Sequence, residues 1–311
     1  MSVEQPLVSI LITSYNYAPY LTEAIESALN QTYPNTEVIV VDDGSTDKSP
    51  EIIASYGDKI IPVYKQNGGQ GSAYNAGFAL TQGNIVCFLD SDDVWLPQKV
   101  EQVVKAFNTY PGAVVAYHQV QSIDKVGQSL GKPWPPYKPI RGDISSQVAR
   151  TGGWWPFPPS SALSYRREFL CKVMDVPDAE KKYRQAADAY LADLAPFCGE
   201  VVGIDRVLSY FRMHGSNNWS NPSKVSKEGW EMREIQDQEF RVNMLNLGLK
   251  RLGIEREVSL NDRLPYQLTK YELGKPTSLF SLSQLTLQNP WEHRLVSKLK
   301  AIALLWLKRG N

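Results

Sequence analysis

Short apolar runs alternate with stretches of helical periodicity along the first 110 residues. Four runs rich in Val, Ile and Leu lie at residues 8–13, 37–41, 60–64 and 85–89. Unbroken apolar runs of this kind are typical of strands buried on both faces of a parallel sheet. Between them, apolar residues recur at helical spacing, as Leu21, Ile25 and Ala28 do after Pro19. The alternation predicts a doubly wound α/β sheet with right-handed crossovers.

The pattern changes twice after this region. Residues 111–220 are less regular, with a Pro- and Trp-rich loop and one predicted helix around 180–196. From about residue 222 the chain is mostly helical in pattern and richer in Lys, Glu, Gln and Leu. We therefore expect an α/β domain over residues 1–220, with halves at about 1–110 and 111–220, followed by a helical extension over 221–311.

Two groups of acids follow the apolar runs: Asp42 and Asp43 after the second run, and Asp90, Asp92 and Asp93 after the fourth. Carboxylates packed this closely raise one another's pKa unless a cation or a set of donors offsets them. Three interpretations fit: a divalent cation that holds a diphosphate, a general acid–base pair as in glycoside hydrolysis, or capping of the next helices. Open α/β sheets bind ligands at the carboxyl ends of their strands, which favours the cation and diphosphate over capping.

Composition argues against several classes of function. The 311 residues contain 33 Lys and Arg against 33 Asp and Glu, so no basic excess indicates a nucleic-acid partner. The three cysteines are scattered without a CxxC pair, which argues against a disulfide framework and a structural zinc site. The N-terminus lacks the features of a signal peptide, and no apolar run approaches the roughly 20 residues of a membrane-spanning helix. We expect a cytoplasmic location.

Longer motifs extend this interpretation. The chain contains, in order, VSILITSYNYAPYLTEAIESALNQTYPNTEVIVVDDGSTD and NGGQGSAYNAGFALTQGNIVCFLDSDDVWLP. This order resembles the nucleotide-diphospho-sugar glycosyltransferases of family 2, which have the GT-A fold. The resemblance is dense over residues 7–118 and thinner over about 150–220, and none is found in the helical extension. It implies a Rossmann-like, mostly parallel sheet flanked by helices, with a nucleotide-binding half followed by an acceptor half.

The resemblance also implies an activity. Such an enzyme is metal-dependent and inverting, and it moves a sugar from a nucleotide-diphosphate donor, here UDP- or dTDP-linked. The acceptor is a hydroxyl of a saccharide, a lipid-linked molecule or a small molecule. A bound Mn²⁺ or Mg²⁺ stabilises the leaving diphosphate as a Lewis acid, and a positioned base takes the acceptor proton. Biosynthesis of a polysaccharide or glycolipid is the expected role.

Positions that match the family's motifs give the expected nucleotide and metal contacts. Thr13 and Tyr15 would hold the base, although Tyr15 is equally compatible with a core aromatic. Asp43 would accept a hydrogen bond from the uracil imide N–H, or its segment would be only a turn. Asp90 would lie near the ribose, and Asp92 would bind the metal.

Two further positions near these motifs, Asp93 and Lys65, have two interpretations each, and a third, Tyr74, departs from the family's pattern. Asp93 is either an acid behind the metal site or a helix cap. Many members have an Arg just before the Asn of the third loop, whereas Tyr74 precedes Asn75 here. Lys65 is the nearest cation in sequence, and it is either a partner of the diphosphate or a solvated residue at a strand end.

Asp188 is the expected catalytic base, because the resembling enzymes have an acid at this point of a helix. Ala187 stands where they often have another acid, and Asp193 is the alternative base. Asp188 could instead be a solvated carboxylate on a helix face. Arg212 and His214 match an Arg-x-His element near the metal and diphosphate, so His214 is the second expected metal ligand, although a lone His is more often a packing residue.

Two further segments have candidate binding roles. The run WWPFPPSS offers aromatic faces and hydroxyls, which suit an acceptor sugar or, alternatively, a cover over the core. Trp154, Trp155 and Arg166 are the expected acceptor residues, with a helix cap as the alternative for Arg166. Residues 291–311 form a basic amphipathic pattern, which fits either an anionic membrane or packing on the same domain or a second subunit.

Other functions remain as alternatives. One is a catalytically degenerate protein that only binds nucleotide sugars. A second is a sugar-phosphate nucleotidyltransferase, which would require a Gly-rich, basic loop after the first strand, where this chain has TSYNYAP. A dinucleotide-dependent oxidoreductase is disfavoured, because no GxGxxG follows a predicted strand.

Overall fold

The computed structural model describes residues 5–176, 187–215, 217, 227–292 and 294–307. The chain divides into two compact units. The first comprises residues 1–143 and 157–220, and the second comprises residues 144–156 and 221–311. The segment 144–156 therefore belongs with the C-terminal helices and not with the sheet that surrounds it in sequence.

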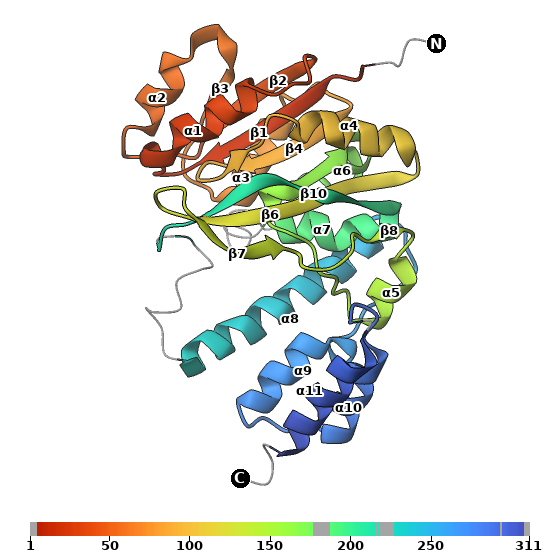
Figure 1. Ribbon diagram of the computed structural model, residues 1–311. Helices are drawn as coiled ribbons and strands as arrows, with labels where there is room; N and C mark the ends of the chain where they lie inside the picture. The colour runs from red at the N-terminus through yellow and green to blue at the C-terminus, as the bar shows by residue number, and fades with distance from the viewer. Residues whose placement is uncertain (1–4, 177–186, 216, 218–226, 293, 308–311) are drawn as a thin grey trace. The chain divides into compact units, whose positions relative to one another are not determined.

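The first unit is built on one large mixed sheet (Figure 1). Its strands are β1 (Val8–Ser14), β2 (Thr36–Asp42), β3 (Ile61–Tyr64), β4 (Ile85–Asp90), β5 (Val94–Trp95), β6 (Ala113–Asp124), β7 (Ser129–Trp134), β8 (Arg141–Gly142), β9 (Leu163–Arg166) and β10 (Glu200–Met213). Its described helices are α1 (Ala18–Leu29), α2 (Ser49–Ser55), α3 (Gln70–Phe78), α4 (Lys99–Thr109), α6 (Arg167–Val173) and α7 (Ala187–Cys198), with 3₁₀ turns at Gly57–Lys59 and Ser160–Ala162.

Strand order confirms the predicted α/β fold and adds a feature that the apolar runs did not indicate. The main path is β3-β2-β1-β4-β9-β6-β10-β5, with β7 paired to β6 and β8 to β10. The four predicted strands are the parallel part, β3-β2-β1-β4. β9 lies antiparallel between β4 and β6, and β6 and β10 are again parallel. The sheet thus continues past its parallel part with mixed rather than purely parallel pairing.

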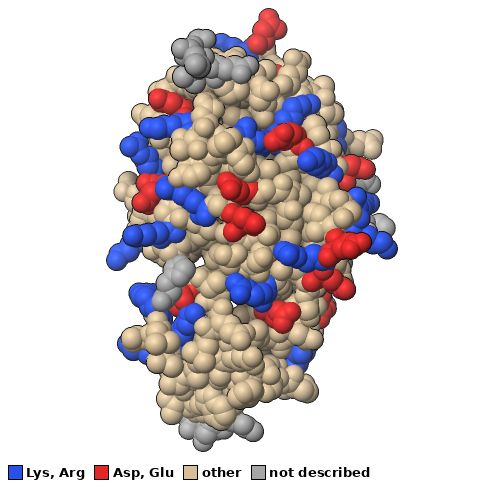
Figure 2. All heavy atoms as spheres, turned by 90° about the vertical axis from the view of Figure 1, so that its right-hand side faces the viewer, with Lys and Arg blue, Asp and Glu red and all other residues tan. Residues whose placement is uncertain are grey.

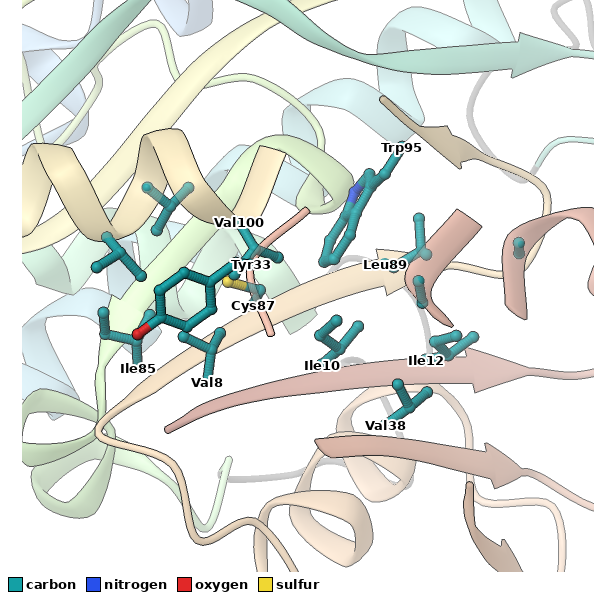
Figure 3. Close-up of a cluster of buried hydrophobic side chains, with 14 of the residues drawn as sticks. Val8, Ile10, Ile12, Tyr33, Val38, Ile85, Cys87, Leu89, Trp95 and Val100 are labelled. Carbon is teal, nitrogen blue, oxygen red and sulfur yellow. The ribbon is translucent and has the colours of Figure 1, made fainter. Parts of the chain in front are cut away.

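Helices cover both faces of this sheet. On one face, α1 and α4 pack on Val8, Ile10 and Ile12 of β1 together with Cys87 and Leu89 of β4 (Figure 3). All of these side chains are buried, because both faces of β1 and β4 are covered.

On the opposite face, α3 packs closely against β1 and β2. A Cβ atom added at Gly77 would lie only 2.2 Å from Leu11 Cδ1 and 2.8 Å from Val41 Cγ2. This face is shared by α6 and α7. The absence of a side chain at Gly77 therefore sets how near α3, and the loop that precedes it, can lie to the strand ends.

The second unit is helical. It contains α5 (Ser145–Arg150), α8 (Lys227–Arg251), a 3₁₀ turn (Leu260–Asp262), α9 (Leu264–Glu272), α10 (Leu279–Gln288) and α11 (Leu295–Leu307). Buried Arg263 joins its two segments, since its guanidinium donates to Gln238 Oε1 at 3.0 Å and to the Gly152 carbonyl at 3.1 Å. Among the described helices of the chain, none has both the length and the apolar character needed to cross a membrane.

A buried histidine lies in the core of the first unit. His118 of β6 has no solvent exposure, and its Nδ1 lies 2.9 Å from the carbonyl of Gln119. Within the described residues its Nε2 atom has no hydrogen-bond partner. Burial, followed by the positive charge of Lys99, lowers the pKa of His118 to about 3. The native state therefore holds this imidazole neutral at pH values where the unfolded chain would protonate it.

We expect His118 to make the free energy of unfolding depend on pH. An unfolded His has a pKa near 6.5, so between pH 6.5 and 3 the unfolded chain binds more protons and stability falls as the pH falls. By pH 5 the loss amounts to about 2 kcal/mol, and above pH 7 it is absent. Urea unfolding of the wild type and of His118→Leu at pH 7.5 and pH 5 measures it. An identical loss between these pH values in both proteins would contradict the assignment.

Candidate active site

The carboxyl ends of three parallel strands meet at one edge of the sheet. Thr13 of β1 is in register with Asp90 of β4, and Ser14 is in register with Asp42 of β2. The two acidic groups that the sequence placed after separate strands therefore flank the end of β1 on either side. This edge is where an open α/β sheet binds its ligands.

Asp43 is buried and fully engaged at this edge. Its Oδ1 accepts from Lys65 Nζ at 2.7 Å and from the Gly68 amide at 2.9 Å. Its Oδ2 accepts from the Gly69 amide at 2.6 Å and from Asn67 Nδ2 at 3.2 Å. Lys65 is thus an ion-pair partner of Asp43 rather than a solvated residue, and Asp43 fixes the loop that precedes α3.

The loop after β1 is tied to the loop after β2. Asn16 has a φ of 59°, a left-handed conformation that Asn tolerates better than most residues. Its amide donates to Ser45 Oγ at 2.9 Å, and its Oδ1 accepts from the Thr46 amide at 2.8 Å. Beside it, the Tyr15 side chain is 46% exposed, so it is not a core aromatic. Its ring stands available at the edge of the sheet.

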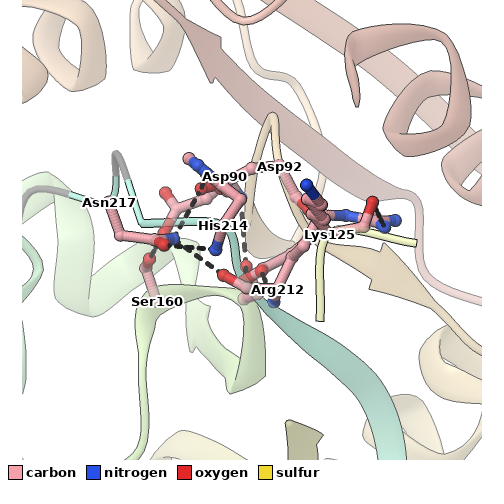
Figure 4. A network of polar contacts seen from close by, with 9 residues as sticks. Asp90, Asp92, Lys125, Ser160, Arg212, His214 and Asn217 are labelled. Carbon is pink, nitrogen blue, oxygen red and sulfur yellow. Dashed lines mark hydrogen bonds and ion pairs between the residues drawn. The ribbon is translucent and has the colours of Figure 1, made fainter. Parts of the chain in front are cut away.

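Asp92 lies next to His214 from the end of β10 (Figure 4). The distance from His214 Nε2 to Asp92 Oδ2 is 3.0 Å, and Asn217 Nδ2 approaches the same oxygen at 3.2 Å. The imidazole is stacked on the Tyr20 ring, with centroids 4.8 Å apart, and meets the edge of Tyr17. His214 is therefore held in one orientation by aromatic neighbours, beside the carboxylate that the sequence paired with it.

Arg212 holds the backbone near Asp92 and His214 in place. Its Nε donates to the carbonyl of Asp92 at 2.9 Å, and its terminal nitrogen bonds Glu23 Oε2 at 2.5 Å. The guanidinium also lies 5.1 Å from the centroid of the Tyr20 ring. Arg212 is buried, and these contacts engage its Nε and one terminal nitrogen with protein groups. It joins α1, the β4 end and β10 in one network.

Two serines support the other acids. Ser160 Oγ donates to Asp90 Oδ2, and Ser161 Oγ donates to Asp93 Oδ2 at 2.6 Å while accepting from the Asp90 amide at 3.1 Å. Asp93 also accepts from the Arg212 amide at 2.9 Å and has no solvent exposure. Of its two predicted roles, capping is excluded, since α4 begins only at Lys99. Asp93 is the acid behind the site that holds distant segments together.

The electrostatics of this cluster favour a positive ligand. Burial, followed by the charge of Asp92, raises the pKa of Asp90 to about 7. Burial also raises the pKa of Asp93 well above its ordinary value, with Asp92 and Asp90 adding to the effect. The pKa of the Tyr17 phenol is raised by burial and then by Asp92. A cation placed here would offset the repulsion that these shifts report.

The charge of Asp188 acts on the same cluster. It lies in the first turn of α7, and its charge contributes to the raised pKa values of Asp90 and Tyr74. Gln70 links the two, because its Oε1 accepts from the Ala187 amide at 2.9 Å and its side chain bonds Asp90. Asp193, the alternative base, is buried further along α7.

The predicted acceptor residue Arg166 is not brought to the acidic cluster. Arg166 is in register with Ile85 at the opposite end of β4 from Asp90, and its guanidinium donates to the carbonyls of Ala113 and Phe107. Trp154 and Trp155 belong to the C-terminal unit, and the Trp155 ring is buried. The structure thus gives Arg166 and Trp155 packing contacts in place of an open binding face.

Several site residues could not be singled out in the sequence. Ser161, Gln70, Glu23 and Asn217 reach the cluster from four separate segments, and no spacing relates them to the acids. The aromatic run TSYNYAPY at a strand end was the one available indication for Tyr17 and Tyr20. Only the fold brings His214 beside these two rings.

The donor set fits a hard cation shared with a diphosphate. No group of three or more His, Cys, Asp or Glu side chains within the described residues is arranged to hold a metal. Asp92 Oδ2 and His214 Nε2 nevertheless lie side by side at the strand-end edge. Mg²⁺ and Mn²⁺ sites on diphosphates commonly use one or two protein ligands and take the rest from phosphate oxygens and water.

Comparison with known proteins gives the family. The model of glycosyl transferase family 2 matches residues 9–173. An uncharacterized glycosyltransferase of Nostoc sp. is 36% identical over 288 residues, which cover 91% of this chain and 86% of that protein. The chondroitin synthase of Escherichia coli is 37% identical over 282 residues, covering 86% of this chain but only 37% of the synthase. This chain belongs to glycosyl transferase family 2, which confirms the predicted enzyme class.

Solved structures give the same fold. TarS of S. aureus, as residues 1–349 in complex with UDP-GlcNAc, aligns with a TM-score of 0.54 and 20% identity, covering 90% of this chain and 85% of that one. The mannosyltransferase PcManGT of Pyrobaculum calidifontis, in complex with GDP-Man and Mn²⁺, aligns with a TM-score of 0.51 and 18% identity, covering 99% and 76%. The predicted GT-A fold is thereby confirmed.

We expect Ser161 to be essential for the geometry of the acidic cluster. Ser161→Ala removes the donor to Asp93 and leaves the Asp90 amide without its acceptor, which costs about 1–3 kcal/mol of unfolding free energy. Exposed Ser129→Ala is the matched control and should change stability by less than about 0.5 kcal/mol. Urea unfolding measures both, and equal stabilities would show that the Ser161 contacts are dispensable.

Proposed function

We propose that this protein is a metal-dependent, inverting glycosyltransferase that uses a UDP- or dTDP-linked sugar. Its acceptor would be a hydroxyl of a saccharide, lipid-linked or small-molecule substrate. One observation carries the proposal: Asp90 at the end of β4 and Asp92 just after it meet His214, which follows β10, at the carboxyl edge of a GT-A sheet, where the charge of Asp188 in α7 also acts on Asp90. The nucleotide sugars bound to the neighbouring structures support the donor class.

In this proposal the β1 and β2 ends bind the nucleotide. The exposed Tyr15 ring lies against the base, with Thr13 beside it and Asp90 near the ribose. Asp43 accepts from the base N–H, which takes the place of the longest of its present contacts, the 3.2 Å bond from Asn67. The amides of Gly68 and Gly69 keep the Asp43 carboxylate in place during this exchange.

Asp92 and His214 would hold Mn²⁺ or Mg²⁺ together with the donor diphosphate. When bound, the cation supplies Lewis-acid stabilisation of the negative charge on the leaving diphosphate. Tyr20 keeps the imidazole plane fixed, and Arg212 fixes the backbone of Asp92. Glu23 in turn holds Arg212 through the 2.5 Å ion pair.

Asp188 would act as the general base. Its carboxylate takes the proton of the acceptor hydroxyl while that oxygen attacks the anomeric carbon. The new glycosidic bond forms on the face opposite the breaking bond to the diphosphate, so the configuration inverts. The bond between the Ala187 amide and Gln70 supports this role, because it ties the start of α7 to the residue that contacts Asp90.

We expect Asp188→Asn to retain nucleotide binding and lose sugar transfer. The amide is nearly isosteric but cannot accept the proton, so kcat should fall by about 10²-fold or more. Calorimetry with UDP and Mn²⁺ measures binding, and a radiolabelled-sugar assay measures transfer and donor hydrolysis. Exposed Asp205→Asn is the control and should behave as the wild type. Normal turnover by Asp188→Asn would remove this residue from the mechanism.

The same assays separate a degenerate binding protein from an enzyme. A wild-type chain that binds the nucleotide sugar but neither transfers nor hydrolyses it, with any divalent cation, would support the binding-only alternative. The binding-only alternative arises because Ala187 stands where the family often has an acid.

We expect chelation to stop transfer and added Mn²⁺ to restore it. Asp92→Asn and His214→Gln should each weaken the Mn²⁺ dependence of UDP binding, by about 10–100-fold in metal affinity, because each removes one of two protein ligands. Exposed Asp58→Asn is the charge-matched control. Titration of Mn²⁺ at fixed UDP is the measurement. Unchanged metal affinity in both variants would exclude the proposed ligands.

A further inference from the structure

The last helix leaves its apolar side chains in solvent. None of the described residues of α11 is buried. Six large apolar side chains are between 49% and 69% exposed, namely Leu295, Val296, Leu299, Leu304, Trp306 and Leu307. The amphipathic pattern of this segment fits either an anionic membrane or packing on the same domain or a second subunit. Leu295, Leu299, Ile302 and Trp306 share one face of the helix by their spacing; the first two and Trp306 are exposed, and Ile302 is half-buried.

Polar contacts hold α11 in this orientation. Tyr271 donates its hydroxyl to the Leu305 carbonyl at 3.2 Å, and Lys298 Nζ donates to the Leu287 carbonyl at the end of α10 at 2.8 Å. The Trp306 indole donates to Ser283 Oγ at 3.1 Å. Phe280 of α10 is also exposed. We call the six exposed residues of α11 and Phe280 the α11 surface.

The charged side chains of α11 itself, Lys298 and Lys300, are cationic. From Arg294 to Arg309 the chain carries five Lys or Arg residues, and it contains no Asp or Glu. Arg294 and Lys300 are exposed in the described part, where Arg294 pairs with Glu292 at 3.2 Å, while Lys308 and Arg309 lie outside it. Elsewhere on the face drawn in Figure 2, acids and bases are interspersed, whereas the lower end, where α10 and α11 lie in Figure 1, has few charged side chains.

We propose that the α11 surface docks on an anionic lipid membrane, with α11 lying in the plane of the interface. A helix with exposed Leu and Trp side chains and cationic flanks gains both apolar burial and attraction to anionic headgroups. Trp306 suits this boundary, because an indole combines an apolar body with a polar N–H. Thirteen residues of helix span about 20 Å, which matches a segment lying along the surface.

The charge distribution favours lipid over a second copy of the chain. A symmetric contact through the α11 surface would bring the cations of one copy close to those of the other, and such like-charge contacts oppose association. Anionic headgroups complement the same cations. This docking is independent of the transfer reaction, so it can be tested without a substrate.

The test is co-sedimentation of the full chain with vesicles. The wild type should bind phosphatidylcholine vesicles that contain phosphatidylglycerol, and bind vesicles of phosphatidylcholine alone much less. The triple variant Leu295→Gln/Leu299→Gln/Leu307→Gln should lower the bound-to-free ratio by about tenfold or more, since three exposed side chains lose their apolar burial. Lys300→Glu, and an ionic strength of about 1 M, should weaken binding to the anionic vesicles alone.

Val126→Gln is the matched control, because Val126 is as exposed as Leu307 but lies in the turn before β7. It should bind vesicles like the wild type, and all variants should keep the wild-type circular dichroism. Equal binding by the wild type and the triple variant, or equal binding of the wild type to neutral and anionic vesicles, would overturn the proposal. The proposal would also be overturned if light scattering showed a dimer for the wild type and a monomer for the triple variant, while the wild type bound no vesicles.

Discussion

Three carboxylates at the end of one strand have to be kept close together without a counter-charge of their own. Asp90, Asp92 and Asp93 follow β4 directly, and burial strengthens their mutual repulsion. Each is offset by donors from elsewhere in the chain: Ser160 for Asp90, the Arg212 amide and Ser161 for Asp93, and Asn217 with His214 for Asp92. The cluster can therefore form only when β4, the turn at 160–162 and the end of β10 have come together.

This requirement explains why the sheet extends beyond its parallel half. β9 pairs with β4 and carries the turn with the two serines to the acids, and β10 delivers Arg212 and His214 from the far side. Arg212 then reaches back to Glu23 in α1. Segments from both halves of the family 2 sheet are thus joined by hydrogen bonds through one charged centre, and a cation at that centre would relieve the remaining repulsion.

The C-terminal unit is held together by contacts of a different kind. Arg263 satisfies its donors inside the unit, which joins residues 144–156 to the helices without any charged ligand. α11 keeps its apolar side chains outside, although burying them would stabilise the unit. Exposed apolar surface of this kind is typical of sites that meet another phase or partner, which is the basis of the membrane docking proposed for α11.

The sequence by itself determined the parallel strands, the GT-A family and the position of the acids at strand ends, because period, turn residues and motif order are local properties. It did not determine that β9 runs antiparallel beside β4, that Asp93 binds Ser161 and the Arg212 amide, or that Arg166 lies at the wrong end of β4 for an acceptor site. Those outcomes depend on contacts between residues some 70 to 120 positions apart, and only tertiary packing decides which distant donor meets which carboxylate.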